Sequence, residues 1–164
     1  MARVYLSLGS NIDREFNIRG AISALRKRYG ELTISRVFES ASVGFEGEDF
    51  YNLAVGLDTD EDVTTINQAV HAIEDGYGRD RSGPRFSSRT LDIDLLLYDD
   101  LVMKEGKLEL PRDEITKNAF VLWPLAEIAA DTLHPCLELS MAQLWADFDK
   151  SKQALHPVTF DFEG

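Results

Sequence analysis

The stretch R-D-R-S-G-P-R-F-S-S-R-T-L-D-I-D-L-L-L, residues 79–97, carries the strongest local signals in this chain. Its second half alternates apolar and acidic residues, the period-two pattern of a half-buried strand. The apolar side of that strand carries Leu91, Ile93, Leu95 and Leu97. On the other side Asp92 and Asp94 share a face, with Cα atoms about 6.5–7 Å apart. Two carboxylates so placed can converge on Mg²⁺, which prefers one or two protein carboxylates completed by phosphate oxygens and water.

The first half of the stretch is a Gly/Ser/Pro loop rich in arginine. It holds four of the eleven arginines of the chain: Arg79, Arg81, Arg85 and Arg89. Arginine is the planar, permanently charged donor suited to phosphate, so the loop and the acid pair together predict a polyphosphate–metal site. Two alternatives stay open. The acids can form a solvated strand face, or the arginines can serve only to neutralise them.

Outward from this stretch, the chain alternates strand and helix patterns. Earlier strands are expected at residues 3–8, 33–40 and 50–59, the last two as an antiparallel pair. Asp13 is expected to cap one amphipathic helix, and Asp62 or Thr64 to begin a second that ends at Gly76. The order β-α-β-β-α-β predicts an α+β fold with a ferredoxin-like antiparallel sheet flanked by helices. The acid pair and the arginine loop then lie at one edge of the sheet's open side.

The remaining third of the chain adds a hairpin and two helices. A short hairpin is expected at 101–110, an apolar and well-buried helix at 118–130, and a last helix at 140–148 that Ser140 caps. The tail from about residue 151 shows no clear pattern and is expected to be loosely held. By length, residues 1–164 form one domain.

Composition and charge limit the classes of function. With 44% hydrophobic and 28% charged residues, the chain has the composition of an ordinary globular protein. Its net charge of −12 argues against a nucleic-acid binder, and no apolar run is long enough for a membrane segment. Cys136 is the only cysteine, which excludes an intrachain disulfide and favours the cytoplasm. We expect a monomer that acts on small molecules.

Three further features suit a ligand site. Glu74 sits at a helix C-terminus, where a negative charge is unfavourable, which hints at a binding role for this residue. Phe86 lies in a Ser-rich loop and has little reason to be apolar unless it covers something. Asn52 shares a strand face with Phe50, and an aromatic ring beside an amide can hold a flat heterocycle. The alternative is that Asn52 is a surface residue.

At this point the motifs resemble a known family, the 6-hydroxymethyl-7,8-dihydropterin pyrophosphokinases of folate biosynthesis. The matching motifs are L-G-S-N at 8–11, F-Y-N at 50–52, I-E at 73–74, G-R-D-R at 78–81, R-T-L-D-I-D-L-L-L at 89–97 and A-F-V-L-W-P-L at 119–125. The resemblance implies transfer of pyrophosphate from ATP, the co-substrate, to the hydroxymethyl group of the dihydropterin, with release of AMP.

The resemblance also implies residue roles. Asp92 and Asp94 would hold two Mg²⁺ ions, and Arg79 and Arg89 would grip the phosphates during the transfer. The residues implied in nucleotide binding are Glu74, Arg81, Arg85, Arg89, Leu95, Lys107 and Arg112. Those implied in pterin binding are Ser42, Val43, Phe50, Asn52, Phe86 and Phe120. Among the latter, Phe50 and Phe120 would sandwich the ring.

The chain departs from the family pattern at several positions. Arg112, followed by Asp113, replaces a usual histidine after Pro111, and Asn118 stands where an arginine is frequent. Phe50 replaces a tyrosine, and Phe86 stands where a tryptophan is frequent. Two alternatives therefore remain beside the pyrophosphokinase: a diverged enzyme acting on another pterin-like or hydroxymethyl compound, and a ferredoxin-like nucleic-acid or regulatory module.

Overall fold

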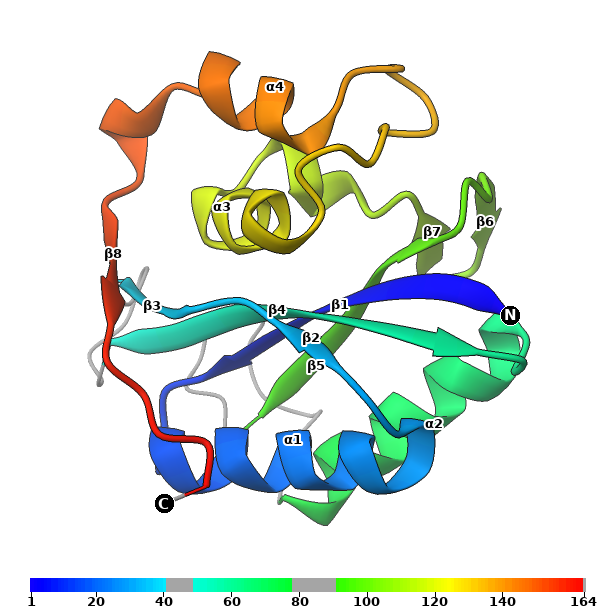
Figure 1. The fold of residues 1–164 in the computed structure, drawn as a ribbon, viewed down its shortest axis with the longest axis vertical. Helices are drawn as coiled ribbons and strands as arrows, with labels where there is room; N and C mark the ends of the chain where they lie inside the picture. The colour runs from blue at the N-terminus through cyan, green and yellow to red at the C-terminus, as the bar shows by residue number, and fades with distance from the viewer. Residues whose placement is uncertain (41–48, 78–90, 164) are drawn as a thin grey trace.

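An antiparallel β-sheet forms the centre of the protein, seen in a computed structural model that describes residues 1–40, 49–77 and 91–163 (Figure 1). Its strands are β1 (Ala2–Ser10), β2 (Thr33–Ile34), β3 (Val37–Ser40), β4 (Phe50–Thr59), β5 (Asp92–Tyr98) and β8 (Leu155–Val158). The strand order is β5-β1-β4-β3-β8, and β2 also pairs with β4. All of these pairs are antiparallel, and β5 lies at one edge.

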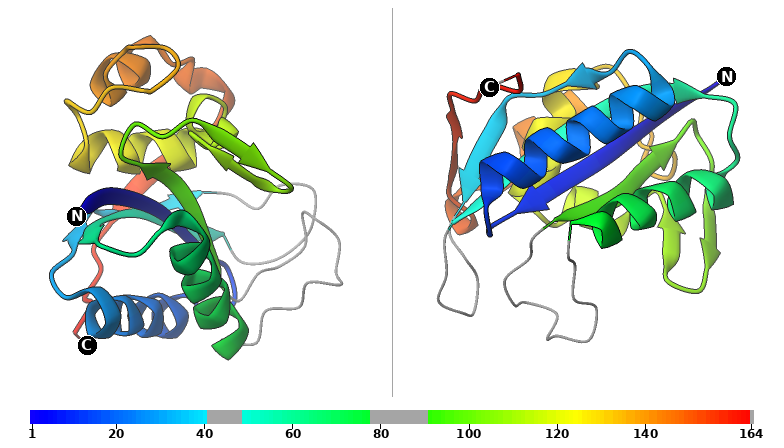
Figure 2. Two further views of the ribbon diagram at one scale, coloured as in Figure 1. Left: turned by 90° about the vertical axis from the view of Figure 1, so that its right-hand side faces the viewer. Right: turned by 90° about the horizontal axis from the view of Figure 1, so that it is seen from below.

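Helices cover both faces of this sheet (Figures 1 and 2). On one face lie α1 (Arg14–Tyr29) and α2 (Val63–Gly76), and on the other lie α3 (Ala119–Ile128) and α4 (Met141–Asp147). The shorter elements are the hairpin β6 (Met103–Glu105) and β7 (Leu108–Leu110) and the 3₁₀ turns η1 (Asp113–Thr116) and η2 (Lys150–Lys152). The predicted α+β class and ferredoxin-like order are confirmed, with α3 and α4 added on the face opposite α1 and α2.

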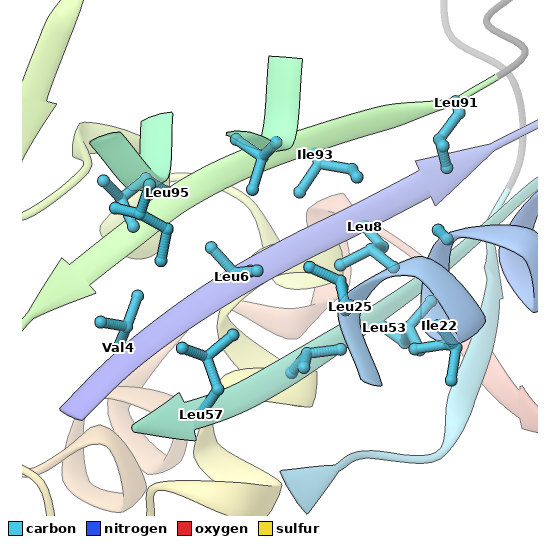
Figure 3. Packing of buried hydrophobic residues seen from close by; sticks show 14 of the residues in the cluster. Val4, Leu6, Leu8, Ile22, Leu25, Leu53, Leu57, Leu91, Ile93 and Leu95 are labelled. Carbon is cyan, nitrogen blue, oxygen red and sulfur yellow. The ribbon is translucent and has the colours of Figure 1, made fainter. Parts of the chain in front are cut away.

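The first hydrophobic core fills the space between the sheet and the helices α1 and α2 (Figure 3). Every second residue of the strands packs there against one apolar stripe of α1, because side chains alternate along a strand and repeat about every 3.6 residues along a helix. Its members include Val4, Leu6, Leu8, Ile18, Ile22, Leu25, Leu53, Leu57, Ile93 and Leu95. The opposite side chains of the same strands therefore face α3.

The second core lies between the sheet and α3. Helix α3 is apolar nearly all round, and most of its residues are buried, as expected for a helix with sheet on one side and α4 on the other. Trp123 joins the layers: its ring lies 4.6 Å from Phe38 of β3 and 5.1 Å from Trp145 of α4, centroid to centroid.

One strand prediction is wrong in detail. Leu97 was expected on the same side as Ile93 and Leu95, but it lies in the second core with Leu96. The register between β1 and β5 shifts at this point, because Tyr5 faces Leu97 whereas its neighbour Leu6 faces Leu95. At this bulge β5 carries one extra residue relative to β1, so beyond it the side chains of β5 point to the opposite faces from those expected.

The single strand expected at 33–40 is also wrong, because it is interrupted into β2 and β3. At the break the Ser35 hydroxyl accepts the Ala54 amide at 2.9 Å, while the Ser35 amide donates to the Ala54 carbonyl at 3.0 Å. The next amide, of Arg36, donates to Glu127 Oε1 of α3 at 2.7 Å instead of to β4. Side-chain oxygens thus replace part of the strand ladder.

The helix caps were predicted with mixed success. Asp62 and Ser140 accept the amides of Thr65 and Gln143 at 2.8 and 3.1 Å, as expected of N-caps. Asp13 occupies the N-cap position of α1, but its φ is +44° and its side chain makes no cap bond. Asp13 is therefore the N-cap residue, as predicted, but its side chain does not cap the helix.

The expectation of a loosely held tail is also wrong. Strand β8 pairs with β3 over Val37 to Ser40 and extends the sheet (Figure 1). Beyond it, Phe160 and Phe162 pack against the first core. The tail therefore forms the edge of the sheet opposite β5.

Candidate functional site

Asp92 and Asp94, the two carboxylates of the edge strand β5, lie on one face of the sheet. Helix α3 covers another part of the same face. Asp92 and Asp94 are only partly buried, whereas Ile93 and Leu95 between and beyond them are buried in the first core. Asp92 lies opposite Gly9 of β1, and Asp94 lies opposite Ser7. The two acids thus share one face of the strand, as the alternation predicted.

Arg112 and Glu114 lie beside this acid pair. The Arg112 guanidinium approaches Asp94 Oδ1 at 3.5 Å and Glu114 Oε1 at 2.8 Å. Burial acts to lower the pKa of Arg112, but the negative charges of Asp94 and Glu114 outweigh it and raise that pKa. The side chain is a permanent cation held at the rim of the acid pair.

Asn52 forms the second part of the site. It lies in β4 directly opposite Gly9, and its Nδ2 donates to Ser40 Oγ of β3 at 3.1 Å. Its Oδ1 lies over Gly9, only 2.9 Å from where a Cβ of that residue would stand. Gly9 therefore provides the space that the amide occupies, because any side chain there would displace it.

These residues form a row across three strands. Asp92 of β5 faces Gly9 of β1, and Gly9 faces Asn52 of β4. With neighbouring strands 4.7–4.9 Å apart, the Cα atoms of Asp92 and Asn52 are separated by about 10 Å. That spacing suits a cation with phosphates at one end and a small flat molecule at the other.

Two partly exposed phenylalanines accompany Asn52. Phe50 precedes it by two residues on β4 and so shares its face. Phe120 is in the first turn of α3, which packs against β4, and it borders the second core. Both rings are only partly buried.

Glu74, at the end of α2, is buried. Its Oε2 accepts the amide of Ile93 at 2.7 Å, and its Oε1 lies 2.9 Å from His71 Nδ1. Because Ile93 stands between the two aspartates, this bond fixes the part of β5 that carries them. Sequence reasoning assigned Glu74 to the nucleotide and missed this supporting contact.

The remaining predicted residues are less informative. The Leu95 side chain is buried in the first core, so only its backbone can reach a ligand. Lys107 is exposed in the turn between β6 and β7. The other candidates lie outside the described residues: Arg79, Arg81, Arg85, Arg89, Ser42, Val43 and Phe86.

Three further residues of the site were not predicted as such: Gly9, Ser40 and Glu114. The L-G-S-N motif pointed to the neighbourhood of Gly9, but its pairing with Asn52 depends on strand register. Ser40 and Glu114 carry no sequence signal, because each acts through a neighbour that only the fold provides.

The donor set fits a hard divalent cation that also binds phosphate. Across residues 1–40, 49–77 and 91–163, no group of three or more His, Cys, Asp or Glu side chains could hold a metal ion alone. Two partly exposed carboxylates are the number that Mg²⁺ commonly takes from a protein when phosphate and water supply the rest. Within the same ranges, no helix is long and apolar enough to cross a membrane.

Comparisons with known proteins identify one family. The family model for 7,8-dihydro-6-hydroxymethylpterin-pyrophosphokinase matches residues 5–130. The 2-amino-4-hydroxy-6-hydroxymethyldihydropteridine pyrophosphokinase of Porphyromonas gingivalis is 37% identical over 82% of this chain and 95% of its own length. The enzyme of that name from Aquifex aeolicus is 35% identical over 82% of this chain and 85% of its own.

Other relatives are longer. A folic acid synthesis protein of Dictyostelium discoideum is 34% identical over 84% of this chain, which spans only 21% of that protein. The bifunctional protein FolKE of Lactococcus lactis is matched over 46% of its length. Among solved structures, HPPK-DHPS of Plasmodium falciparum has a TM-score of 0.72 at 15% identity, covering 88% of this chain and 43% of the other. At that identity the likeness concerns the fold alone.

Proposed function

The chain belongs to the 7,8-dihydro-6-hydroxymethylpterin-pyrophosphokinase family, and from that premise we propose that it transfers the pyrophosphoryl group of ATP to the hydroxymethyl group of 6-hydroxymethyl-7,8-dihydropterin. AMP is the second product. The observation that supports the proposal is the row formed by Asp92, Gly9 and Asn52, in which a pair of carboxylates and an amide share one face of the sheet.

In this proposal the pterin lies at the Asn52 end. Phe50 and Phe120 hold the two faces of the ring, and the Asn52 amide reads its polar edge. The Asn52···Ser40 bond fixes the amide before the pterin arrives, which lowers the entropy lost on binding. Ser42, Val43 and Phe86 are proposed as further pterin contacts on the motif evidence.

The nucleotide phosphates lie at the Asp92 and Asp94 end. These carboxylates would hold two Mg²⁺ ions, which when bound supply charge stabilisation to the polyphosphate. Arg112 adds a fixed guanidinium, and Arg79, Arg81, Arg85 and Arg89 are proposed to grip the phosphates. Glu74 holds β5 in place and, with the Leu95 backbone and Lys107, is proposed to contact the nucleotide.

The transfer itself is a displacement at phosphorus. The hydroxymethyl oxygen forms a bond to the β-phosphorus, the bond from that phosphorus to the α–β bridging oxygen breaks, and AMP leaves with the electron pair. The hydroxyl proton is released. Alignment and charge stabilisation are the main demands of such a step, and a rigid sheet that carries both ends of the site meets the first.

The experiment that tests the proposal is AMP release from ATP and Mg²⁺, measured with and without the dihydropterin. AMP formation that depends on the pterin is the expected result. If the folded protein binds ATP but forms AMP only with a different heterocyclic alcohol, the substrate assignment is wrong and the diverged-enzyme alternative holds.

We further propose that residues 1–164 form a single pyrophosphokinase domain that acts as a monomer in the cytoplasm on small molecules. The net charge of −12 supports the absence of a nucleic-acid partner, because a basic surface is what such binding requires.

A further inference from the structure

Glu114, which the sequence left unassigned, joins several parts of the site. Its Oε1 accepts a hydrogen bond from Arg112 Nε at 2.9 Å and forms an ion pair with Nη2 at 2.8 Å. Its Oε2 accepts Asn118 Nδ2 at 3.1 Å. The carboxylate therefore joins η1 to the residue that precedes α3.

Arg112 is shared unequally between two carboxylates. Its Nη2 is 2.8 Å from Glu114 but 3.5 Å from Asp94, a distance beyond the usual range for a charge-assisted hydrogen bond. The Arg112 backbone is fixed as well, because its amide donates to the Leu96 carbonyl at 3.0 Å, at the bulge in β5. The guanidinium is thus held next to Asp94 without closing on it.

We propose that Glu114 is a positioning residue that holds Arg112 away from full pairing with Asp94. Arg112 then does not close on Asp94, the carboxylate assigned to a divalent cation, and its guanidinium can serve the phosphates that accompany the cation. This inference rests on the proposed function, since it assigns Asp94 to the metal and Arg112 to the nucleotide.

The second oxygen of Glu114 is held in turn by residues far along the chain. Asn118 Oδ1 lies 3.5 Å from Gln153 Nε2, which also donates to the Lys117 carbonyl at 3.0 Å. Gln153 Oε1 accepts the Ala119 amide at 2.7 Å and so anchors the start of α3. With one oxygen on Arg112 and the other on this anchored Asn118, the Glu114 carboxylate has a fixed orientation.

The arrangement also gives the two departures from the family pattern a common reason. Arg112 and Asn118 stand where a histidine and an arginine are usual, and in this chain both bind the same carboxylate. An arginine so close to a metal ligand needs a competing anion, which Glu114 supplies. The two residues are therefore coupled through one carboxylate.

The test is a titration with Mn²⁺, which stands in for Mg²⁺, in the presence of a non-hydrolysable ATP analogue and without pterin. We expect Glu114→Gln to weaken Mn²⁺ binding about tenfold, the low end of what the loss of an outer partner costs a metal site. We expect the double variant Glu114→Gln/Arg112→Gln to regain most of that affinity, because Arg112 is then no longer present to close on Asp94.

Glu127→Gln is the matched control. Glu127 binds Arg36 through Nε and Nη2 at 2.9 and 2.8 Å at the far end of α3, with 23% side-chain exposure against 28% for Glu114. This variant should bind Mn²⁺ as the wild type does. Asn118→Ala provides a milder second variant, with a smaller loss that Arg112→Gln also reverses.

Unchanged Mn²⁺ affinity in Glu114→Gln would overturn the proposal. So would a double variant that is as weak as Glu114→Gln, because the loss would then come from the missing charge alone. A wild type that binds no Mn²⁺ with the analogue would remove the metal assignment and the inference together. Pterin-dependent AMP release tests the reaction separately, so failure of the reaction and failure of the positioning role are distinguishable.

Discussion

Replacing Gly9 with alanine is the sharpest test of how the fold builds the proposed pterin end of the site. The added Cβ would stand 2.9 Å from Asn52 Oδ1. Non-bonded heavy atoms prefer separations of about 3.5–4.0 Å, so the amide has to move by about 0.5 Å or more. Asn52 is buried in the sheet and bound to Ser40, so it has little room to move without losing that bond.

The expected cost has two parts. Overpacking a well-packed region costs about 1–3 kcal/mol of unfolding free energy. The Asn52···Ser40 bond, 3.1 Å long, contributes a further 0.5–1.5 kcal/mol or so when it breaks. A displaced amide should lose about one hydrogen bond to the pterin. Such a bond is worth up to about 1.4 kcal/mol, so pterin binding should weaken by about tenfold. Nucleotide binding should change much less.

The assay is a pterin titration followed by fluorescence, with thermal unfolding measured on the same samples. Gly56→Ala is the matched control: its Cβ would stand 2.8 Å from Arg3 Nη2 and 2.9 Å from Tyr5 Cε1, in the same pair of strands but away from Asn52. Both variants should lose stability, and only Gly9→Ala should lose pterin affinity. Equal pterin affinity in the two variants would refute the reasoning.

Three further predictions follow from other contacts. Asp94→Ala should keep the fold, since this side chain is 39% exposed. It should lower turnover at least a hundredfold, because it removes charge stabilisation worth several kcal/mol. Asp58→Ala on the same sheet should not lower turnover, and a steady-state rate assay compares the two variants. Gln153→Ala removes the cap on the Ala119 amide and should lower the unfolding free energy by about 1 kcal/mol, measured by urea denaturation. Burial and the hydrogen bond to Glu61 raise the pKa of Tyr29 to about 12. The contribution of this shift to stability is therefore present below the ordinary tyrosine pKa of about 10 and is lost as pH rises toward 12. An ultraviolet titration should show a tyrosine that ionises near the raised pKa in the wild type and is missing in Tyr29→Phe.

The parts of the fold that sequence predicted are those with a strong local period. The alternation around Ile93 and the helical spacing of Ile18, Ile22 and Leu25 each determine which face is buried, and the structure buries those faces. The strand at 50–59 was predicted with its observed ends for the same reason. Local periodicity is sufficient where one face of an element meets a core.

The parts that sequence missed depend on contacts between distant segments. The bulge that turns Leu97 over, and the break at Ser35, arise from partners on neighbouring strands and leave no mark in local spacing. The edge strand β8 contains Pro157 and lacks an alternation of apolar and polar residues. Its pairing with β3 therefore depends on the exposed edge of β3 more than on an intrinsic preference of its residues for strand structure.

The same distinction separates the predicted from the unpredicted half of the site. Asp92 and Asp94 are two apart on one strand, so their common face follows from the strand period alone. Their closeness to Asn52 does not, because it requires the register that sets Gly9 between β5 and β4. Glu114 was invisible for a related reason: its partners Arg112 and Asn118 come together only around the turn η1.

The segment beyond the family match contributes to both ends of the proposed site. The match ends at residue 130, but β8 pairs with β3 at Ser40, the residue that accepts the Asn52 amide. Gln153 anchors the start of α3 immediately before Phe120, and it holds Asn118, through which it reaches Glu114. A sheet edge and a helix start are both places where backbone groups lack partners, and the tail supplies partners at each. The geometry of the matched region in this chain therefore depends on residues that lie outside it.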